Sequence, residues 1–176
     1  KSTLIKNNYF NIVKTGIYAI ENSLNNYTIE NNTFMGNTTF QSNKAIAASN
    51  NSSWNPASFN VYKNCVEDYK EGTHLENING AIIKGNFIIH TRQGVILENS
   101  DDGNINLNNI AGDYSSDLVG IYGMYSQRNI FSCNRTAFFQ YNFVFAGDCN
   151  NSKLTKNNIE DATDKGADIL VGGGRS

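Results

Sequence analysis

Thr28-Ile29-Glu30-Asn31-Asn32-Thr33-Phe34 is the stretch that decides the fold, because the chain repeats it. Clear further copies occupy residues 4–10, 82–88, 105–110 and 154–159, and two weaker copies occupy residues 61–66 and 130–135. The last asparagine of each copy serves as a marker, and the markers are Asn8, Asn32, Asn64, Asn86, Asn109, Asn134 and Asn158. Successive markers lie 22–25 residues apart, except for one interval of 32. A period held along the whole chain indicates a solenoid built one coil at a time.

Most coils carry a second landmark, a small residue eight positions after the marker that opens a short apolar run. Examples are Gly16-Ile17-Tyr18-Ala19-Ile20 and Gly94-Val95-Ile96-Leu97. Short apolar runs bounded by Gly, Asn and Asp are typical of strands, and no helical periodicity is present. Strands that recur every 22–25 residues can stack in parallel, about 4.8 Å apart. The sequence therefore predicts an all-β, single-stranded parallel β-helix of about seven coils, with stacked asparagines forming a ladder at one turn.

The coil that follows Asn32 departs from the pattern. Residues 35–60 hold polar Asn and Ser stretches, together with the only tryptophan, Trp54, and the only proline, Pro56. We predict one loop insertion near 35–60, which would form the lip of a binding surface because loops mounted on a scaffold commonly carry function. The predicted domain organisation is a β-helix over residues 1–171, either whole or a segment of a longer solenoid, followed by a Gly-rich tail at 172–176.

Composition excludes several classes of partner. The formal net charge of −2 argues against nucleic acid, which requires a basic stripe. No run approaches the roughly 18 apolar residues of a membrane helix, so no membrane span is predicted. The three cysteines, Cys65, Cys133 and Cys149, give neither an even disulfide framework nor a metal-ligand spacing. We expect them to be buried free thiols.

The Ile-x-Asn-Asn-x-Phe units, followed by strands such as Gly-Ile-Tyr-Ala-Ile-Glu-Asn, resemble the right-handed parallel β-helix proteins of the pectate-lyase-like superfamily. The resemblance covers nearly the whole chain. It implies a right-handed coil, in agreement with the rule for parallel crossovers, and a generic secreted or cell-surface bacterial protein. It does not select one activity, because this fold hosts polysaccharide lyases, glycoside hydrolases, adhesins, phage tailspikes and purely structural solenoids.

Stacking predicts one candidate site. Residues at the same number of positions after three consecutive markers would lie side by side on neighbouring coils. Carboxylates, a histidine, tyrosines and cations would meet there: Asp68, His90, Asp113, Tyr69, Tyr114, Lys70 and Arg92. In a cleft for an anionic sugar, Lys70 or Arg92 would act as a base or a carboxylate clamp, and a tyrosine or His90 as an acid. The aspartates would hold a cation, and Tyr69, Tyr114 and Trp54 would contact the substrate. The alternative is a turn in which opposite charges offset each other.

A second candidate site directly follows the predicted strands that open with the small-residue landmark, called the Gly strands below. Glu76 and Glu98 would stand on adjacent coils, where like charges repel unless a cation or a base lies between them, and Asp101 and Asp102 follow directly. The set suits Ca²⁺ binding or acid/base work on a glycosidic bond, and otherwise consists of solvated turn acids. Asp101-Asp102 is similar to the paired aspartates of polygalacturonase-type hydrolases, although the companion motifs Asn-Thr-Asp, Gly-His-Gly and Arg-Ile-Lys are missing.

Aromatic residues on the Gly strands supply another clue. Tyr18, Tyr122 and Tyr125 fall on that face, and alternation along each strand would point some of them outward as platforms on which sugars stack.

Three functions remain open. The missing catalytic motifs and the near-neutral charge favour a non-catalytic extracellular solenoid, structural or carbohydrate-binding, of a secreted or cell-surface protein. A polysaccharide lyase or glycoside hydrolase acting on acidic polysaccharide, with Ca²⁺ as the candidate cofactor, is the first alternative. The second is an assembly or adhesin module that stacks end to end on further coils or binds other surface proteins, because an uncapped β-helix exposes strand edges.

Overall fold

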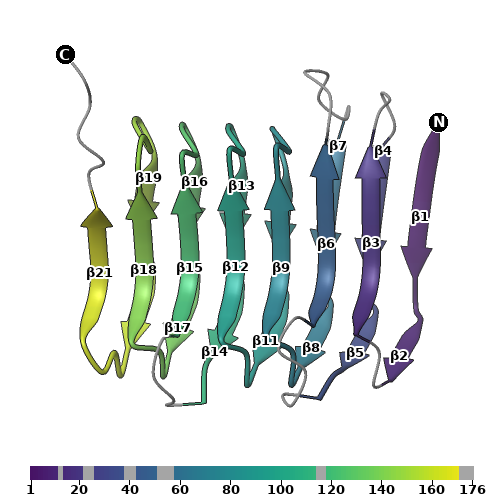
Figure 1. The fold of residues 1–176 in the computed structure, drawn as a ribbon, viewed down its shortest axis with the longest axis horizontal. Helices are drawn as coiled ribbons and strands as arrows, with labels where there is room; N and C mark the ends of the chain where they lie inside the picture. The colour runs from purple at the N-terminus through teal and green to yellow at the C-terminus, as the bar shows by residue number, and fades with distance from the viewer. Residues whose placement is uncertain (12–13, 22–25, 38–42, 51–57, 114–117, 171–176) are drawn as a thin grey trace.

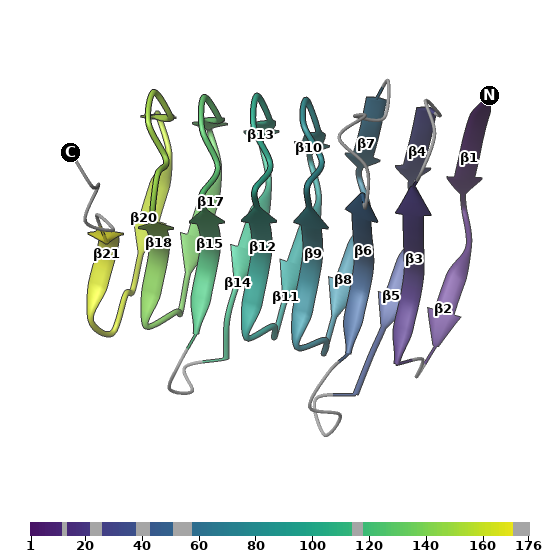
Figure 2. The ribbon, with the colours of Figure 1, turned by 45° about the horizontal axis from the view of Figure 1, so that its top comes forward.

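The computed structural model describes residues 1–11, 14–21, 26–37, 43–50, 58–113 and 118–170 (Figure 1). Its 21 strands form three sheets of seven, and every pairing between neighbouring strands is parallel. The front strands run upward, the rear strands run downward, and successive coils advance from right to left (Figures 1 and 2). This is the right-handed sense, so the predicted right-handed parallel β-helix of about seven coils is confirmed.

Each coil contributes one strand to each sheet. Sheet A contains β1 (Ser2–Lys6), β4 (Asn26–Glu30), β7 (Ser58–Tyr62), β10 (Ile82–Lys84), β13 (Asn104–Asn106), β16 (Ile130–Ser132) and β19 (Lys153–Thr155). Sheet B contains β2 (Tyr9–Asn11), β5 (Thr33–Met35), β8 (Cys65–Glu67), β11 (Phe87–Ile89), β14 (Asn109–Ala111), β17 (Arg135–Ala137) and β20 (Asn158–Glu160). Sheet C contains β3 (Thr15–Glu21), β6 (Lys44–Asn50), β9 (Glu71–Glu76), β12 (Gln93–Glu98), β15 (Val119–Met124), β18 (Tyr141–Ala146) and β21 (Lys165–Leu170).

The core runs along the axis of the solenoid, because strand alternation sends every second side chain inward. In sheet A the inward column is Ile29, Val61, Ile83, Ile105 and Phe131, each at most 1% exposed. Burying an isoleucine or a phenylalanine stabilises a fold by about 1.5–3 kcal/mol, so a column of such residues favours the observed register strongly.

An asparagine ladder crosses the turn between sheets A and B. Its members are Asn8, Asn32, Asn64, Asn86, Asn108, Asn134 and Asn157. In each of the first six, the backbone N–H and the side-chain Nδ2 both donate to the Oδ1 of the next member, at 2.9–3.1 Å. From Asn32 onward, Nδ2 also donates to a backbone carbonyl of the preceding coil, as Asn86 does to Val61 at 3.0 Å. The predicted ladder is therefore confirmed, and each amide from Asn32 to Asn134 joins three coils.

Two ladder members differ from the sequence markers. The structure places Asn108 and Asn157 in the ladder, whereas the marker rule selected Asn109 and Asn158. Asn109 and Asn158 instead begin β14 and β20. Choosing the last asparagine of an adjacent pair was wrong in these coils, and the positions predicted to follow Asn109 shift by one residue.

The backbone explains which asparagine enters the ladder. The preceding residue is left-handed in every coil, with φ between 51° and 67°: Asn7, Asn31, Lys63, Gly85, Leu107, Cys133 and Lys156. This conformation turns the chain from sheet A into sheet B. Asn and Gly adopt it readily, whereas it costs roughly 1–2 kcal/mol for residues such as Leu107 and Cys133. The ladder hydrogen bonds offset that cost.

The region near 35–60 is not one loop. It contains β6, which pairs with β3 and β9 in ordinary register. The sequence concealed this strand because Ala45 replaces the glycine that opens most of the other runs and the run is rich in alanine. Residues 38–42 and 51–57, which include Trp54 and Pro56, lie outside the described residues.

We predict that Asn108→Ala destabilises the chain by about 3 kcal/mol, because it removes the acceptor of two Asn86 donors and the donor to the Ile83 carbonyl. The matched control is Asn109→Ala, which loses a bond from Arg135 and should cost less than about 1 kcal/mol. Urea unfolding followed by circular dichroism measures both. Equal losses in the two variants would contradict the ladder assignment.

Candidate functional site

The outer face of sheet C carries the most elaborate group of polar side chains. Tyr18, Ala47, His74, Ile96 and Tyr122 form one register column across β3, β6, β9, β12 and β15. The flanking residues Ile17, Ile46 and Val95 point into the core, so strand alternation turns this column outward. Parallel columns on the same face hold Lys44 with Glu71, and Ser49 with Glu76.

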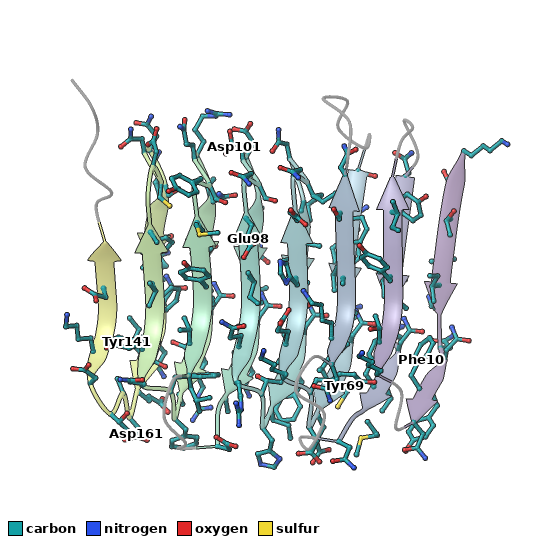
Figure 3. The ribbon with its side chains drawn as sticks, in the orientation of Figure 1. Phe10, Tyr69, Glu98, Asp101, Tyr141 and Asp161 are labelled. Carbon is teal, nitrogen blue, oxygen red and sulfur yellow. The ribbon has the colours of Figure 1, made fainter. Side chains whose placement is uncertain are left out.

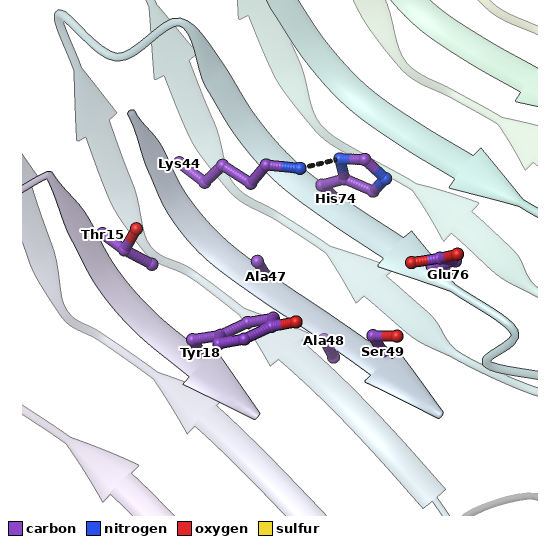
Figure 4. A pocket seen from close by; sticks show the side chains of 8 residues that line it. All are labelled: Thr15, Tyr18, Lys44, Ala47, Ala48, Ser49, His74 and Glu76. Atoms are coloured by element: carbon purple, nitrogen blue, oxygen red, sulfur yellow. Dashed lines mark hydrogen bonds between the residues drawn. The ribbon is translucent and has the colours of Figure 1, made fainter. Parts of the chain in front are cut away.

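A pocket opens on this face over β3, β6 and β9 (Figure 4). Its lining consists of Thr15, Tyr18, Lys44, Ala47, Ala48, Ser49, His74 and Glu76. Tyr18 is 59% exposed and the two alanines are 3% exposed. Ala47 is the register neighbour of both Tyr18 and His74, so its small side chain forms a floor between these two larger side chains, and polar groups surround it.

Lys44, Glu71 and His74 form a tight triangle beside the pocket. Lys44 Nζ lies 2.9 Å from Glu71 Oε2, His74 Nδ1 lies 2.7 Å from the same oxygen, and Lys44 Nζ lies 2.6 Å from His74 Nδ1. His74 Nε2 lies 3.5 Å from Glu98 Oε2. Nδ1 accepts from Lys44 in one tautomer and donates to Glu71 in the other. In either tautomer, side chains of the same face contact both ring nitrogens.

Glu71 is ionised within this triangle. Burial by itself would raise the pKa of its carboxyl, but hydrogen bonds from His74 and Lys44, together with their charges, lower that pKa overall. Nearby, burial and then the charge of Glu98 raise the pKa of Tyr122, so its phenol remains protonated. Within the described part of the chain, the half-buried Glu76 carboxylate has no hydrogen-bond or ion-pair partner.

A second cluster lies where β8 and β11 end. His90 Nδ1 is 3.6 Å from Glu67 Oε1 and 3.6 Å from Asp68 Oδ1. One ligand atom from each residue lies within 4.8 Å of the other two, which makes this the one group of three potential metal ligands among the described residues. Asp68 and His90 have left-handed backbones, with φ of 59° and 51°, so they mark the same corner in adjacent coils.

Sequence reasoning brought Asp68 and His90 together correctly, but it omitted Glu67. Asp113 is not part of this group, because the ladder residue is Asn108 and the residue that corresponds to His90 in the next coil is Gly112. Lys70 and Arg92 do lie on adjacent coils, where the Arg92 N–H donates to the Lys70 carbonyl at 3.1 Å.

The expected substrate-contacting aromatic residues are placed differently. Tyr69 is 0% exposed and belongs to the core, so its ring cannot stack on a ligand (Figure 3). Tyr114 and Trp54 lie outside the described residues. Tyr18 and Tyr125 are exposed, as alternation allowed.

The four predicted calcium ligands do not form one cluster. Glu98 lies along β12, whereas Asp101 lies at the corner beyond it (Figure 3). Arg128 Nε is 2.7 Å from Asp102 Oδ1 and Arg128 Nη2 is 3.1 Å from Asp101 Oδ2. The hydrogen bond that Arg128 donates to Asp102, together with the charge of Arg128, lowers the pKa of Asp102. A guanidinium therefore offsets the charge of the paired aspartates. Glu76 and Glu98 are register partners on sheet C, as predicted.

The residues that sequence reasoning missed are Lys44, Glu71, His74 and Glu67. Lys44 lies on the unrecognised β6, and Glu71 lies one residue before the glycine landmark. Alternation supplied a signal for Glu67, which is outward because the adjacent Val66 is inward. It gave no such signal for Glu71, because alternation places that residue on the same side as the inward Thr73, two positions later.

A right-handed β-helix built from three sheets of parallel strands defines a β-solenoid of the pectate-lyase-like superfamily. Within that class, residues 41–171, about three quarters of the chain, match the family described as NosD, periplasmic copper-binding protein. The chain belongs to the NosD family. No curated protein matches it significantly.

The family assignment makes the chain an extracytoplasmic β-solenoid, since the family is described as periplasmic. Among the residues that the structure describes, there is no helix with the length and apolar character needed to cross a membrane.

The Glu71 triangle predicts a pH dependence of stability. Because the folded-state pKa is lowered from its ordinary value of 4.5, the stabilisation is complete above that pH and is lost as the pH falls through the folded-state pKa. Compared with Glu71→Gln, the parent chain should be more stable by about 1 kcal/mol at neutral pH. That advantage should shrink in acid. Thermal unfolding across pH measures it, and an advantage that grows in acid would contradict the assignment.

Proposed function

We propose that this chain is a non-catalytic, carbohydrate-binding β-solenoid of a secreted or cell-surface protein, and that the glycan lies on the outer face of sheet C. The observation that carries the proposal is the pocket in which the exposed Tyr18 ring stands beside an alanine floor with polar side chains around it. An aromatic ring offers a sugar an apolar surface, while convergent polar groups fix its orientation.

The shape of the face supports an oligosaccharide as the ligand. Successive strands of sheet C lie about 4.8 Å apart, so outward columns present side chains at regular intervals along the axis. Ser49 and Glu76 continue the pocket along one such column toward Glu98. Several sugar units could contact the face in succession.

The contacts of His74 favour binding over catalysis. A general base needs a ring nitrogen directed at the substrate, but both nitrogens of His74 already contact Lys44, Glu71 or Glu98. Hydrolysis by Glu76 and Glu98 and lyase chemistry at Lys70 and Arg92 remain alternative proposals. End-to-end assembly is a third, supported by the outermost strands of sheet A in this chain, β1 and β19, each of which has one sheet neighbour.

A panel of glycans tests this proposal. Binding of each glycan is measured, and cleavage is detected by the release of reducing ends or of unsaturated products. We expect binding without cleavage, and Tyr18→Ala should weaken it about tenfold or more through loss of the stacking surface. Tyr9→Ala is the matched control, because Tyr9 is 64% exposed in the same coil but lies on sheet B. Cleavage products, or equal effects of the two substitutions, would contradict the proposal.

Copper binding is a second candidate function. The description of the NosD family names it, and the Glu67–Asp68–His90 corner offers two carboxylates and one imidazole in this chain. Oxygen and imidazole donors suit Cu²⁺ better than Cu⁺, which prefers thiolate and thioether ligands. We therefore propose this corner as the place where Cu²⁺ would bind.

The two histidines of the chain make a matched test of the copper proposal. Titration with Cu²⁺, followed by electron paramagnetic resonance, should show one bound ion with nitrogen hyperfine coupling. His90→Gln should remove that nitrogen signal and weaken binding about tenfold or more, whereas His74→Gln should leave both unchanged. Loss of the signal only in His74→Gln, or in neither variant, would contradict the assignment.

A further inference from the structure

The charges around the sheet C pocket are unevenly compensated. Lys44 is the cation in its lining, and it already lies 2.9 Å from Glu71, so these two charges offset each other. Glu76 also lines the pocket, and it has no partner among the described residues. A partly buried carboxylate without a counter-charge favours a cation from the ligand.

Glu98 reinforces this negative charge. It is the register partner of Glu76 on the neighbouring strand, about 4.8 Å along the axis. The contact of Glu98 Oε2 with His74 Nε2 is long, at 3.5 Å, and offsets the charge only if the imidazole is protonated. With His74 neutral, Glu76 and Glu98 leave the face with two uncompensated negative charges, and with His74 protonated they leave one.

The nearest other cations on these strands lie at the opposite end. Lys70 directly precedes β9 and Arg92 directly precedes β12, whereas Glu76 and Glu98 end those strands. Six residues of extended chain span roughly 20 Å, about two and a half Debye lengths at physiological salt. Lys14, before β3, likewise lies at the starting end of its strand. These cations therefore do not neutralise the Glu76 end of the pocket.

From these charges we infer that the pocket takes a sugar unit bearing a free, protonated amine. The inference rests on the proposed function and specifies its ligand. The sugar ring lies on Tyr18, and the ammonium group donates to Glu76 with Glu98 close by. Charge-assisted hydrogen bonds of this kind are shorter and stronger than neutral ones. A uronate carboxylate at the same position would face two like charges, so the face selects against the acidic polysaccharides considered from the sequence.

Three oligosaccharides of equal length test the inference: a fully deacetylated glucosamine oligomer, its N-acetylated counterpart and an oligouronate. Calorimetry at mildly acidic pH, where the glucosamine amines are largely protonated, should show the deacetylated oligomer binding about tenfold more tightly than the acetylated one. Added salt should reduce the difference in affinity between the deacetylated and acetylated oligomers, because salt screens the charge interaction. The oligouronate should bind most weakly.

Glu76→Gln should abolish most of the preference for the amine while leaving the N-acetylated oligomer nearly unaffected. Glu30→Gln is the matched control, because it removes one carboxylate from the end of β4 on sheet A, away from the pocket, and should leave the preference intact. Circular dichroism verifies that both variants are folded.

The possible outcomes distinguish a failure of this inference from a failure of the proposed carbohydrate-binding function. Equal binding of acetylated and deacetylated oligomers, a preference for the oligouronate, or a preference that survives Glu76→Gln would overturn the inference and leave a carbohydrate-binding face in place. Absence of binding to any neutral, cationic or anionic oligosaccharide would overturn both.

Discussion

The asparagine ladder is the interaction on which the rest of the structure depends. A single carboxamide such as that of Asn86 accepts from Asn64, donates to Asn108 and donates to the Val61 carbonyl. Each coil is thereby aligned with the coils on both sides of it. Because side chains alternate with a period of two, a slip of one residue would send a whole column from the core to the surface. The composition of every outer face follows from this alignment.

The two candidate sites show how one repeat generates different chemistry. At the corner after sheet B, left-handed backbones place Asp68 and His90 on adjacent coils, and the outward Glu67 joins them. On sheet C, stacking instead produces the Lys44–Glu71–His74 triangle beside an open pocket. The formal net charge of −2 conceals this sorting, since a cation directly precedes each of β9 and β12, whereas Glu76 and Glu98 end these two strands.

The periodic features were predictable from the sequence, and the local ones were not. Strand stacking followed from the recurring Asn-Asn units, and the pairing of Glu76 with Glu98 and of Asp68 with His90 followed from counting. The choice between Asn108 and Asn109 depends on which residue takes a left-handed backbone, and adjacent asparagines carry no signal for that choice. The contacts of Lys44 depend on β6, which was not predicted because its alanine-rich sequence differs from the sequences of the neighbouring sheet C strands.

The central claim is that the outer face of sheet C, held in register by the ladder, is the ligand-binding surface. Nuclear magnetic resonance of the ¹⁵N-labelled chain titrated with the deacetylated glucosamine oligomer tests it most directly. The account predicts shifts confined to β3, β6, β9 and β12, and largest near Tyr18 and Glu76. Shifts centred on the Glu67–His90 corner or on sheets A and B, or no shifts at all, would contradict it.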